Sequence, residues 1–308
     1  MGSPHTFRSA FAFVLLSALS LSGAGCGEPE AAPPASDDAI QQVYEGKLTL
    51  AQAQSFCRCQ LQVVKLAGTV FHFGLDLSQS PPAFFPFQST VPGTLVSIAE
   101  LPITRQLNIR SDGNGEWSAN AVKIKGFPLR VSFIYENTGY VTTKSQVFEI
   151  GDAGISDVSV QFPTQAYFTL AKAQIEQQIG ALIGAPYTLN NILVTTIGKS
   201  WASMFNPMLP HGDPGAQVTV SPAIQFPASV GPIYFNQSVA PDPTINATSV
   251  DGGVLFGNLA SGRYSFTAVK APFTYSTVNF AIQDGIGLYV ASPPHGIQSS
   301  NDSLAGQP

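Results

Sequence analysis

The chain contains an internal repeat, and this feature restricts its fold more than any other. One copy begins with residues 92–98 (PGTLVSI) and the other with residues 214–220 (PGAQVTV), each a Pro-Gly turn followed by a strand of alternating apolar side chains. In both copies an Asp-Gly turn comes next, at Asp112 and Asp251, and further alternating strands follow. Short strands of period two between turns are typical of sandwiches and barrels. The sequence therefore predicts an all-β fold of two similar modules, the second enlarged by an insertion around residues 231–243.

The composition fits this fold and excludes several functional classes. The 28 Gly, 24 Pro and 21 Phe residues favour strands and turns over helices. Charged residues make up 11% of the chain, against about 25% in an average soluble domain, which argues against a cytosolic helical enzyme. The formal net charge of −5 offers no basic surface, so nucleic acid is not an expected partner.

The N-terminus is typical of an export signal. Within residues 1–25, an apolar run at residues 11–21 precedes a group of small residues, and the run is too short to span a membrane. The context of Cys26 resembles a bacterial lipobox, in which the cysteine is lipidated and becomes the mature N-terminus. Gly23 stands where leucine is usual, so ordinary cleavage after a small residue is the alternative. We expect an exported protein of the bacterial cell envelope, anchored to the outer membrane by a lipid on Cys26.

Segments without strand patterns are expected at the ends of the modules. Residues 26–47 are rich in Pro, Ala and acidic residues, which predicts a disordered spacer after the lipidated cysteine. A short helix is expected over residues 48–62 and a connecting helix over residues 164–186, and residues 294–308 are expected to form a disordered tail. The connecting helix is predicted from one apolar stripe: Phe168, Ala171, Ile175, Ile179 and Leu182.

The order of motifs within each copy resembles a known domain family. The first copy carries Ala-Gly-Thr-Val, Pro-Gly, Asp-Gly-Asn-Gly and Gly-Tyr at residues 67–70, 92–93, 112–115 and 139–140, and the second carries related motifs at residues 214–215, 251–253 and 261–266. This order is similar to that of the carboxypeptidase regulatory-like, or transthyretin-like, domain. The resemblance implies Ig-like β-sandwich modules over residues 63–163 and 187–293. It implies little about function, because such modules serve as stabilisers, spacers and binding domains.

Two groups of residues suggest metal ligands. Asp112, Asn114 and Glu116 alternate oxygen ligands as calcium loops do, although Asp-Gly-Asn-Gly is also an ordinary hairpin turn. His211 and Asp213, with His295, could offer ligands to a transition metal, but they also fit a polar turn. We therefore expect no metal cofactor, with calcium at Asp112, Asn114 and Glu116 as the alternative.

Aromatic side chains are the candidates for ligand binding. Rings at the surface stack on sugars or peptides, whereas rings in small sandwiches are more often part of the core. The candidate residues are Trp117, Tyr140, Trp201 and Tyr275.

The cysteines that follow Cys26 are Cys57 and Cys59. On a helix they would point to different faces and bridge poorly, and in an extended segment they would lie near the limit of reach. A strained, redox-labile disulfide and a pair of buried thiols both fit the sequence.

These features predict a non-enzymatic, membrane-tethered surface or periplasmic lipoprotein whose modules act in binding, adhesion or assembly, with a carbohydrate or protein ligand. The alternative is a secreted serine hydrolase. Residues 198–202 (GKSWA) are similar to a nucleophile elbow around Ser200, and His211 and Asp213 follow. That elbow needs a helix directly after the serine, and the prolines that follow Ser200 interrupt any helix. The sequence therefore predicts no catalytic site.

Overall fold

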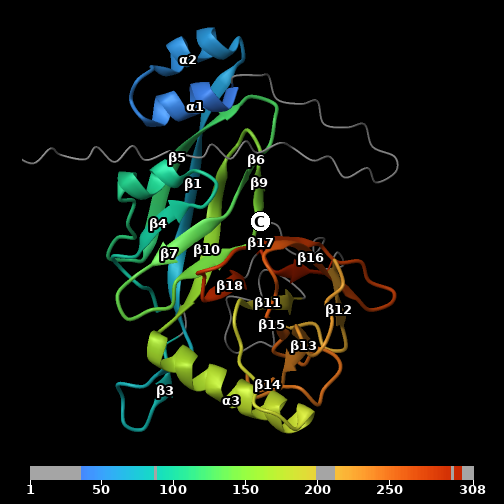
Figure 1. Ribbon diagram of the computed structural model, residues 1–308. Coiled ribbons are helices and arrows are strands. Elements are labelled where there is room, and N and C mark those ends of the chain that lie inside the picture. Colours follow the sequence, from blue (N-terminus) through green and yellow to red (C-terminus); the bar gives the residue numbers. More distant parts are fainter. Residues whose placement is uncertain (1–35, 87–88, 199–211, 293–294, 300–308) are drawn as a thin grey trace, which may run out of the picture.

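The computed structural model describes residues 36–86, 89–198, 212–292 and 295–299, and most of its elements are strands, which confirms the all-β fold class (Figure 1). The elements as far as residue 163 are α1 (Ser36–Tyr44), α2 (Leu50–Cys57), β1 (Leu61–Phe73), β2 (Leu75–Asp76), β3 (Ala83–Phe84), β4 (Leu95–Ile98), η1 (Pro102–Leu107), β5 (Glu116–Ile124), β6 (Leu129–Val131), β7 (Phe133–Glu136), β8 (Thr143–Ser145), β9 (Phe148–Ile150) and β10 (Ile155–Pro163). The elements that follow are α3 (Gln165–Ile183), β11 (Ile192–Gly198), β12 (Gln217–Ser221), β13 (Val230–Phe235), β14 (Pro241–Asp242), β15 (Gly253–Gly257), β16 (Gly262–Val269), β17 (Val278–Ile282), β18 (Leu288–Ala291) and β19 (Ile297–Gln298).

The first copy of the repeat is a sandwich of two layers. In one layer β1 is the middle strand, antiparallel to β5 and parallel to β10. The other layer contains β4, β7 and β8. Alternate side chains of β1 enter the space between the layers, where Leu66 and Val70 are buried with Phe133 of β7 and Phe162 of β10. The period-two pattern of the sequence thus becomes an alternation between core and surface.

The second copy repeats this pairing. β11 is antiparallel to β15 and parallel to β18, as β1 is to β5 and β10. The facing layer consists of β12, β16 and β17. Between the layers, Phe266 packs against Phe256 and Phe280, with ring centroids 4.8 Å and 5.8 Å apart. The insertion around residues 231–243 falls on β13 and β14, which extend the sheet beyond β15.

The two copies share one sheet. Its nine strands run in the order β14-β13-β15-β11-β18-β8-β7-β4, with β19 also paired to β11. The copies meet where β18 pairs with β8 in parallel, so that Leu288 lies opposite Thr143 and Val290 opposite Ser145. We call this pairing the β8–β18 junction. The predicted modules are therefore sandwiches joined edge to edge rather than independent units.

A buried lysine lies at the β8–β18 junction. Lys144 of β8 is 1% exposed, and its Nζ donates to the carbonyl of Ala281 (3.1 Å) and to Oε1 of Gln283 (3.0 Å), both in the second copy. Burial lowers the pKa of Lys144, although the charge of Glu100 acts in the opposite direction. A cation of the first copy is thus held by oxygen atoms of the second.

α3 occupies the predicted connecting segment and covers part of the shared sheet. The side chain of Thr164 accepts a hydrogen bond from the first turn, and Gly184, with φ of 69°, ends the helix. Ile175 and Ile179 are buried against β11, β13, β15 and β18. Leu182 is 67% exposed, so the predicted apolar stripe does not extend to it. Among the described residues, no helix combines the length and apolar content needed to cross a membrane.

α1 lies inside the predicted disordered spacer, residues 26–47, and corrects that prediction. Ala39 is fully buried, and the hydroxyl oxygen of Tyr44 accepts a hydrogen bond from the backbone N–H of Val122 in β5 (2.8 Å). These contacts pack α1 against the end of the first sandwich, beside α2. The sequence did not predict this helix, because its polar composition suggests disorder and much of its stability comes from packing against the sandwich.

Two further boundaries differ from the prediction. The helix expected over residues 48–62 is the shorter α2, because β1 already begins at Leu61 and pairs there with β5. The tail expected over residues 294–308 contains β19, whose Ile297 is fully buried in the core of the second copy. A short strand at the end of a chain carries too little pattern to be found from the sequence.

Candidate functional site

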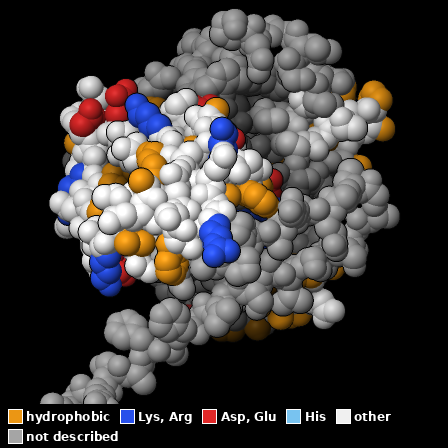
Figure 2. All heavy atoms as spheres, turned by 90° about the horizontal axis from the view of Figure 1, so that it is seen from above, with side chains coloured by type: hydrophobic (Ala, Val, Ile, Leu, Met, Phe, Trp, Pro, Cys, Tyr) orange, Lys and Arg blue, Asp and Glu red, His pale blue; other side chains and the backbone are white. Residues whose placement is uncertain are grey.

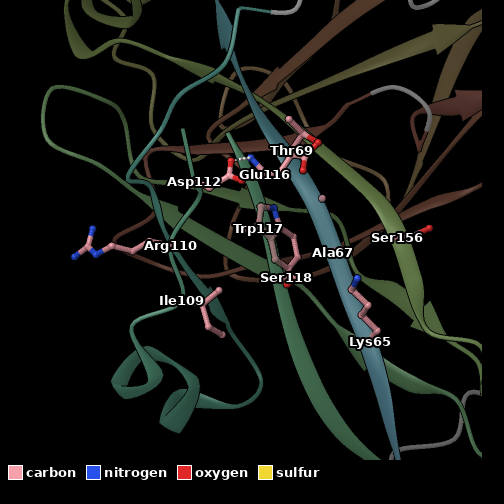
Figure 3. A pocket seen from close by; sticks show the side chains of 11 residues that line it. Lys65, Ala67, Thr69, Ile109, Arg110, Asp112, Glu116, Trp117, Ser118 and Ser156 are labelled. Atoms are coloured by element: carbon pink, nitrogen blue, oxygen red, sulfur yellow. Dashed lines mark hydrogen bonds between the residues drawn. The ribbon is translucent and has the colours of Figure 1, made fainter. Parts of the chain in front are cut away.

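A polar pocket of about 510 Å³ opens on the first sandwich, around β1, β5 and β10 (Figure 3). Its walls come from these three strands and from the segment before β5. The lining residues are Lys65, Ala67, Gly68, Thr69, Ile109, Arg110, Asp112, Glu116, Trp117, Ser118 and Ser156. Lys65, Thr69, Glu116 and Ser118 alternate with core residues along β1 and β5. The pocket therefore uses outward-facing residues of the pattern that builds the core, together with the buried residues Gly68 and Trp117.

Gly68 allows β10 to approach β1 closely beside the pocket. The β1–β10 pairing is irregular between Leu66 and Gly68, and a Cβ atom on Gly68 would lie 1.7 Å from the carbonyl oxygen of Val158. Gly68 also lies opposite Trp117 in the β1–β5 pairing, and the same Cβ atom would come within 3.0 Å of the indole nitrogen. Glycine is thus required for β10 to approach β1 this closely.

Trp117 contributes the edge of its ring to the pocket rather than its face. The side chain is 3% exposed and packs against Phe133 and Tyr135, with ring centroids 5.0 Å and 6.3 Å away. Its Nε1 has no hydrogen-bond acceptor among the residues that the structure describes. Figure 3 shows this nitrogen at the end of the pocket where Asp112, Glu116 and Thr69 lie. The predicted role of Trp117 in stacking is wrong, because the ring faces lie in the core.

The side chain of Asp112 stabilises the turn before β5. Its Oδ1 accepts hydrogen bonds from the backbone N–H groups of Asn114 (2.8 Å) and Glu116 (3.0 Å). This is the arrangement of a side-chain-capped turn, and Gly115 follows with φ of 74°. Within the described ranges, no three His, Cys, Asp or Glu side chains converge to hold a metal ion. The hydrogen bonds of Asp112 are those of a hairpin turn, and calcium at Asp112, Asn114 and Glu116 stays a prediction.

Arg110 is held in place at the other side of the pocket. Its Nη1 donates to the carbonyl of Gly93 (2.8 Å) and its Nε donates to Oδ1 of Asn108 (3.0 Å). A guanidinium fixed by two neutral acceptors keeps N–H groups available for a further acceptor. The pocket thus presents a carboxylate at the exposed Glu116, whereas the guanidinium of Arg110 points away from Trp117, β1 and β5 (Figure 3).

Tyr140 lies in a separate aromatic group. Its ring stacks on Phe162 (4.8 Å between centroids), and its hydroxyl lies 3.1 Å from Nδ1 of His72, which stacks on Phe85 (4.1 Å). Partial burial raises the pKa of Tyr140 and lowers the pKa of His72. Tyr140 is half-buried and does not line the Trp117 pocket.

Asp213, a member of the predicted hydrolase alternative, forms a buried polar cluster in the second copy. The residue is 3% exposed, its Oδ2 accepts a hydrogen bond from the hydroxyl of Tyr275 (2.6 Å), and its Oδ1 is ion-paired with Nζ of Lys270. Burial, and the hydrogen bond to Asp213, raise the pKa of Tyr275. Both partners belong to the connection between β16 and β17. The carboxylate therefore fastens this connection to the segment before β12.

The predicted site residues do not come together in a single site. Cys26, Ser200, Trp201 and His211 lie outside the described residues. Trp117 and Tyr140 pack with the first core, whereas Tyr275 packs with the second. Sequence reasoning did not predict that Lys65 and Arg110 line the same pocket as Trp117, because strand pairing and not sequence spacing brings these residues together. The available signal was the alternation of polar residues along β1 and β5.

No protein-family model and no curated protein matches this chain. Among solved structures it is similar to the TIE protein of Bacillus anthracis, with 14% identity over 74% of this chain and 32% of that chain and a TM-score of 0.20. It is also similar to the shaft pilin spaA of Lactobacillus rhamnosus GG (9% identity, 77% of this chain, 97% of that chain, TM-score 0.21). The minor pilin GBS52 of Streptococcus agalactiae gives 8% identity over 76% and 95% of the two chains, with a TM-score of 0.22. This chain spans about a third of the TIE chain. These scores carry no functional argument, so the proposals that follow depend on the residues of this chain.

Proposed function

We propose that this chain is a non-enzymatic surface protein whose first sandwich binds carbohydrate in the Trp117 pocket. The observation that carries the proposal is the indole N–H of Trp117, which is buried at the pocket without an acceptor among the described residues. A buried N–H group without a partner costs about 1–3 kcal/mol. Because this nitrogen is buried, a ligand oxygen reaches it only when the pocket opens at that point, and this contact would then remove the cost.

The chemistry of the lining favours a ligand rich in hydroxyl groups. Lys65 donates hydrogen bonds, Glu116 accepts them, and Thr69 and Ser118 do both. Sugar hydroxyls likewise donate and accept, whereas a simple anion or cation would be repelled by part of the lining. The volume of about 510 Å³ lies within the range of small-ligand pockets, roughly 300–1,000 Å³. We therefore infer a saccharide of one or two residues as the unit that is recognised.

Trp117→Phe and Glu116→Ala are both expected to weaken saccharide binding. The first removes the unpaired N–H and keeps an aromatic ring in the core, and the second removes an exposed acceptor. Loss of one hydrogen bond of about 1–1.5 kcal/mol predicts a loss of affinity of about 5- to 12-fold. The measurement is calorimetric titration with disaccharides of neutral hexoses, N-acetylhexosamines and hexuronic acids.

Lys125→Ala serves as the matched control, because Lys125 is exposed and does not line the pocket. Melting temperatures of all variants show whether the Trp117 substitution has disturbed the core. The proposal is abandoned if none of the disaccharides binds the wild-type chain, or if both pocket variants bind as tightly as Lys125→Ala.

We further propose that the two sandwiches are transthyretin-like and that a lipid on Cys26 holds them at the bacterial envelope. The proposal is supported by the sequence before the described fold, in which an apolar run at residues 11–21 and a group of small residues precede Cys26. When the chain is expressed in a bacterial host, wild type is expected in the membrane fraction with a diacylglycerol mass, and Cys26→Ala in the soluble fraction. A soluble wild-type protein with an unmodified terminus would exclude the tether and favour secretion.

A further inference from the structure

The structure resolves the alternatives for the two cysteines after Cys26: Cys57 and Cys59 form a disulfide, with their Cα atoms 5.2 Å apart. Cys57 is the last residue of α2, so the regular helix that would separate the two side chains has already ended. Arg58, with φ of 53°, takes the left-handed conformation that turns the chain between them. The disulfide therefore encloses one residue, Arg58, and lies between the end of α2 and the start of β1.

The fold around this bridge is held by other contacts. The side-chain Nε2 of Gln54 donates to the carbonyl of Leu61 (2.6 Å), and the N–H of Lys125 donates to the carbonyl of Gln60 (2.8 Å). The buried residues Ala53 and Leu61 belong to one apolar cluster with β5. A disulfide that closes so short a loop restricts the unfolded chain much less than one that closes a long loop. Opening the bridge is therefore expected to leave the fold intact.

The two sulfur-bearing residues differ in access. Cys57 is 5% exposed, whereas Cys59 is partly exposed and has exposed neighbours in Arg58 and Gln60. Figure 2 shows the end of the molecule that carries α1 and α2, where lysine and arginine side chains lie among acidic, hydrophobic and uncharged groups. A positive charge beside a sulfur favours the approach and formation of thiolates. An incoming thiolate thus reaches Cys59 more readily than Cys57.

We propose that Cys57–Cys59 is an exchangeable disulfide that oxidises accessible thiols. A thiolate of the partner attacks Sγ of Cys59, the bond between the two sulfurs breaks, and Cys57 leaves as a thiolate. A second partner thiol then attacks the mixed disulfide and releases Cys59. The bridge gains two electrons and two protons, and the two partner thiols become a disulfide. The partner is a thiol of either kind, a small thiol such as glutathione or a surface dithiol of another protein.

The test uses the full chain with Cys26→Ala, so that Cys57 and Cys59 are the remaining cysteines. The native protein is incubated with millimolar reduced glutathione, or with a reduced dithiol peptide, then quenched with acid and labelled with maleimide for mass analysis. The expected result is that each chain takes up two labels while its melting temperature and circular dichroism are unchanged. A faster reaction with the peptide than with glutathione would identify a protein dithiol as the preferred partner, and the reverse order a small thiol. A bridge that stays closed to both until the protein is denatured overturns the proposal.

Two single variants test which sulfur is attacked. Cys57→Ser leaves Cys59, which is expected to react rapidly with maleimide in the folded protein. Cys59→Ser leaves Cys57, which is expected to react at least several-fold more slowly. Equal rates, or the reverse order, would overturn the assignment of Cys59 as the attacked sulfur, and the rates in denaturant provide the reference for each thiol.

Discussion

Phe133→Ala in the first sandwich and Phe266→Ala in the second are each expected to lower the free energy of unfolding by about 3–5 kcal/mol, and both are expected to shift the same transition. Each ring is fully buried at the centre of its own core. β7, which carries Phe133, pairs with β8, and β8 pairs with β18 of the second copy. The loss of either core therefore removes the support of the shared sheet. The measurement is urea unfolding followed by far-ultraviolet circular dichroism and by tryptophan fluorescence.

The control for this pair is Leu182→Ala, on the exposed side of α3, which is expected to change stability by about 0.5 kcal/mol or less. Coincident midpoints from both probes in all three variants indicate one cooperative unit. If two transitions are seen, and each phenylalanine variant moves a different one, the sandwiches fold independently and the junction contributes little.

Asp213→Ala is expected to cost about 3 kcal/mol, because it leaves a cation and a hydroxyl without their buried acceptor. The carboxylate of Asp213 is ion-paired with Lys270, accepts a hydrogen bond from Tyr275 and is almost fully buried. Its backbone carbonyl also accepts from the hydroxyl of Thr248 (2.5 Å), so the whole residue is part of one network. The measurement is the urea midpoint at neutral pH, with the slope of the transition checked for change.

Asp157→Ala is the matched comparison for this cluster. Asp157 pairs with His295 at 3.1 Å, but half of its side chain is exposed. Exposed pairs of this kind contribute about 1 kcal/mol or less, so this variant is expected to stay close to wild type. Equal losses in the two variants would show that burial of Asp213 does not make its contacts stronger than those of a surface pair.

The faces of the strands could be predicted from the sequence, and so could the repeat. Pro-Gly turns at Gly93 and Gly215 have positive φ in the structure, and both precede strands of the layer that faces β1 or β11. Trp117 lies between the polar residues Glu116 and Ser118, so its inward direction follows from the same alternation. The candidate stacking role ignored this neighbour pattern, and the structure corrects it.

The β8–β18 junction could not be predicted, because alternation identifies faces and not edges. β8 consists of Thr143, Lys144 and Ser145, a polar segment that is typical of a loop. All three residues are buried, since their backbone pairs on both sides and Lys144 finds acceptors in the second copy. The Trp117 pocket could not be predicted from the sequence for a related reason. Its parts come together through the pairing of β1 with β5 and β10, which sequence spacing does not encode.

The β8–β18 junction also sets an order of events while the chain is being made. Synthesis proceeds from the N-terminus, so β8 is complete long before its partner at Leu288 to Ala291 emerges. During that interval one edge of the first sandwich has free backbone N–H and carbonyl groups, which pair readily with other chains. Nascent or truncated chains that end before β18 would therefore depend on a chaperone to shield this edge. A strand of the second copy, β18, thus covers an edge of the first sandwich.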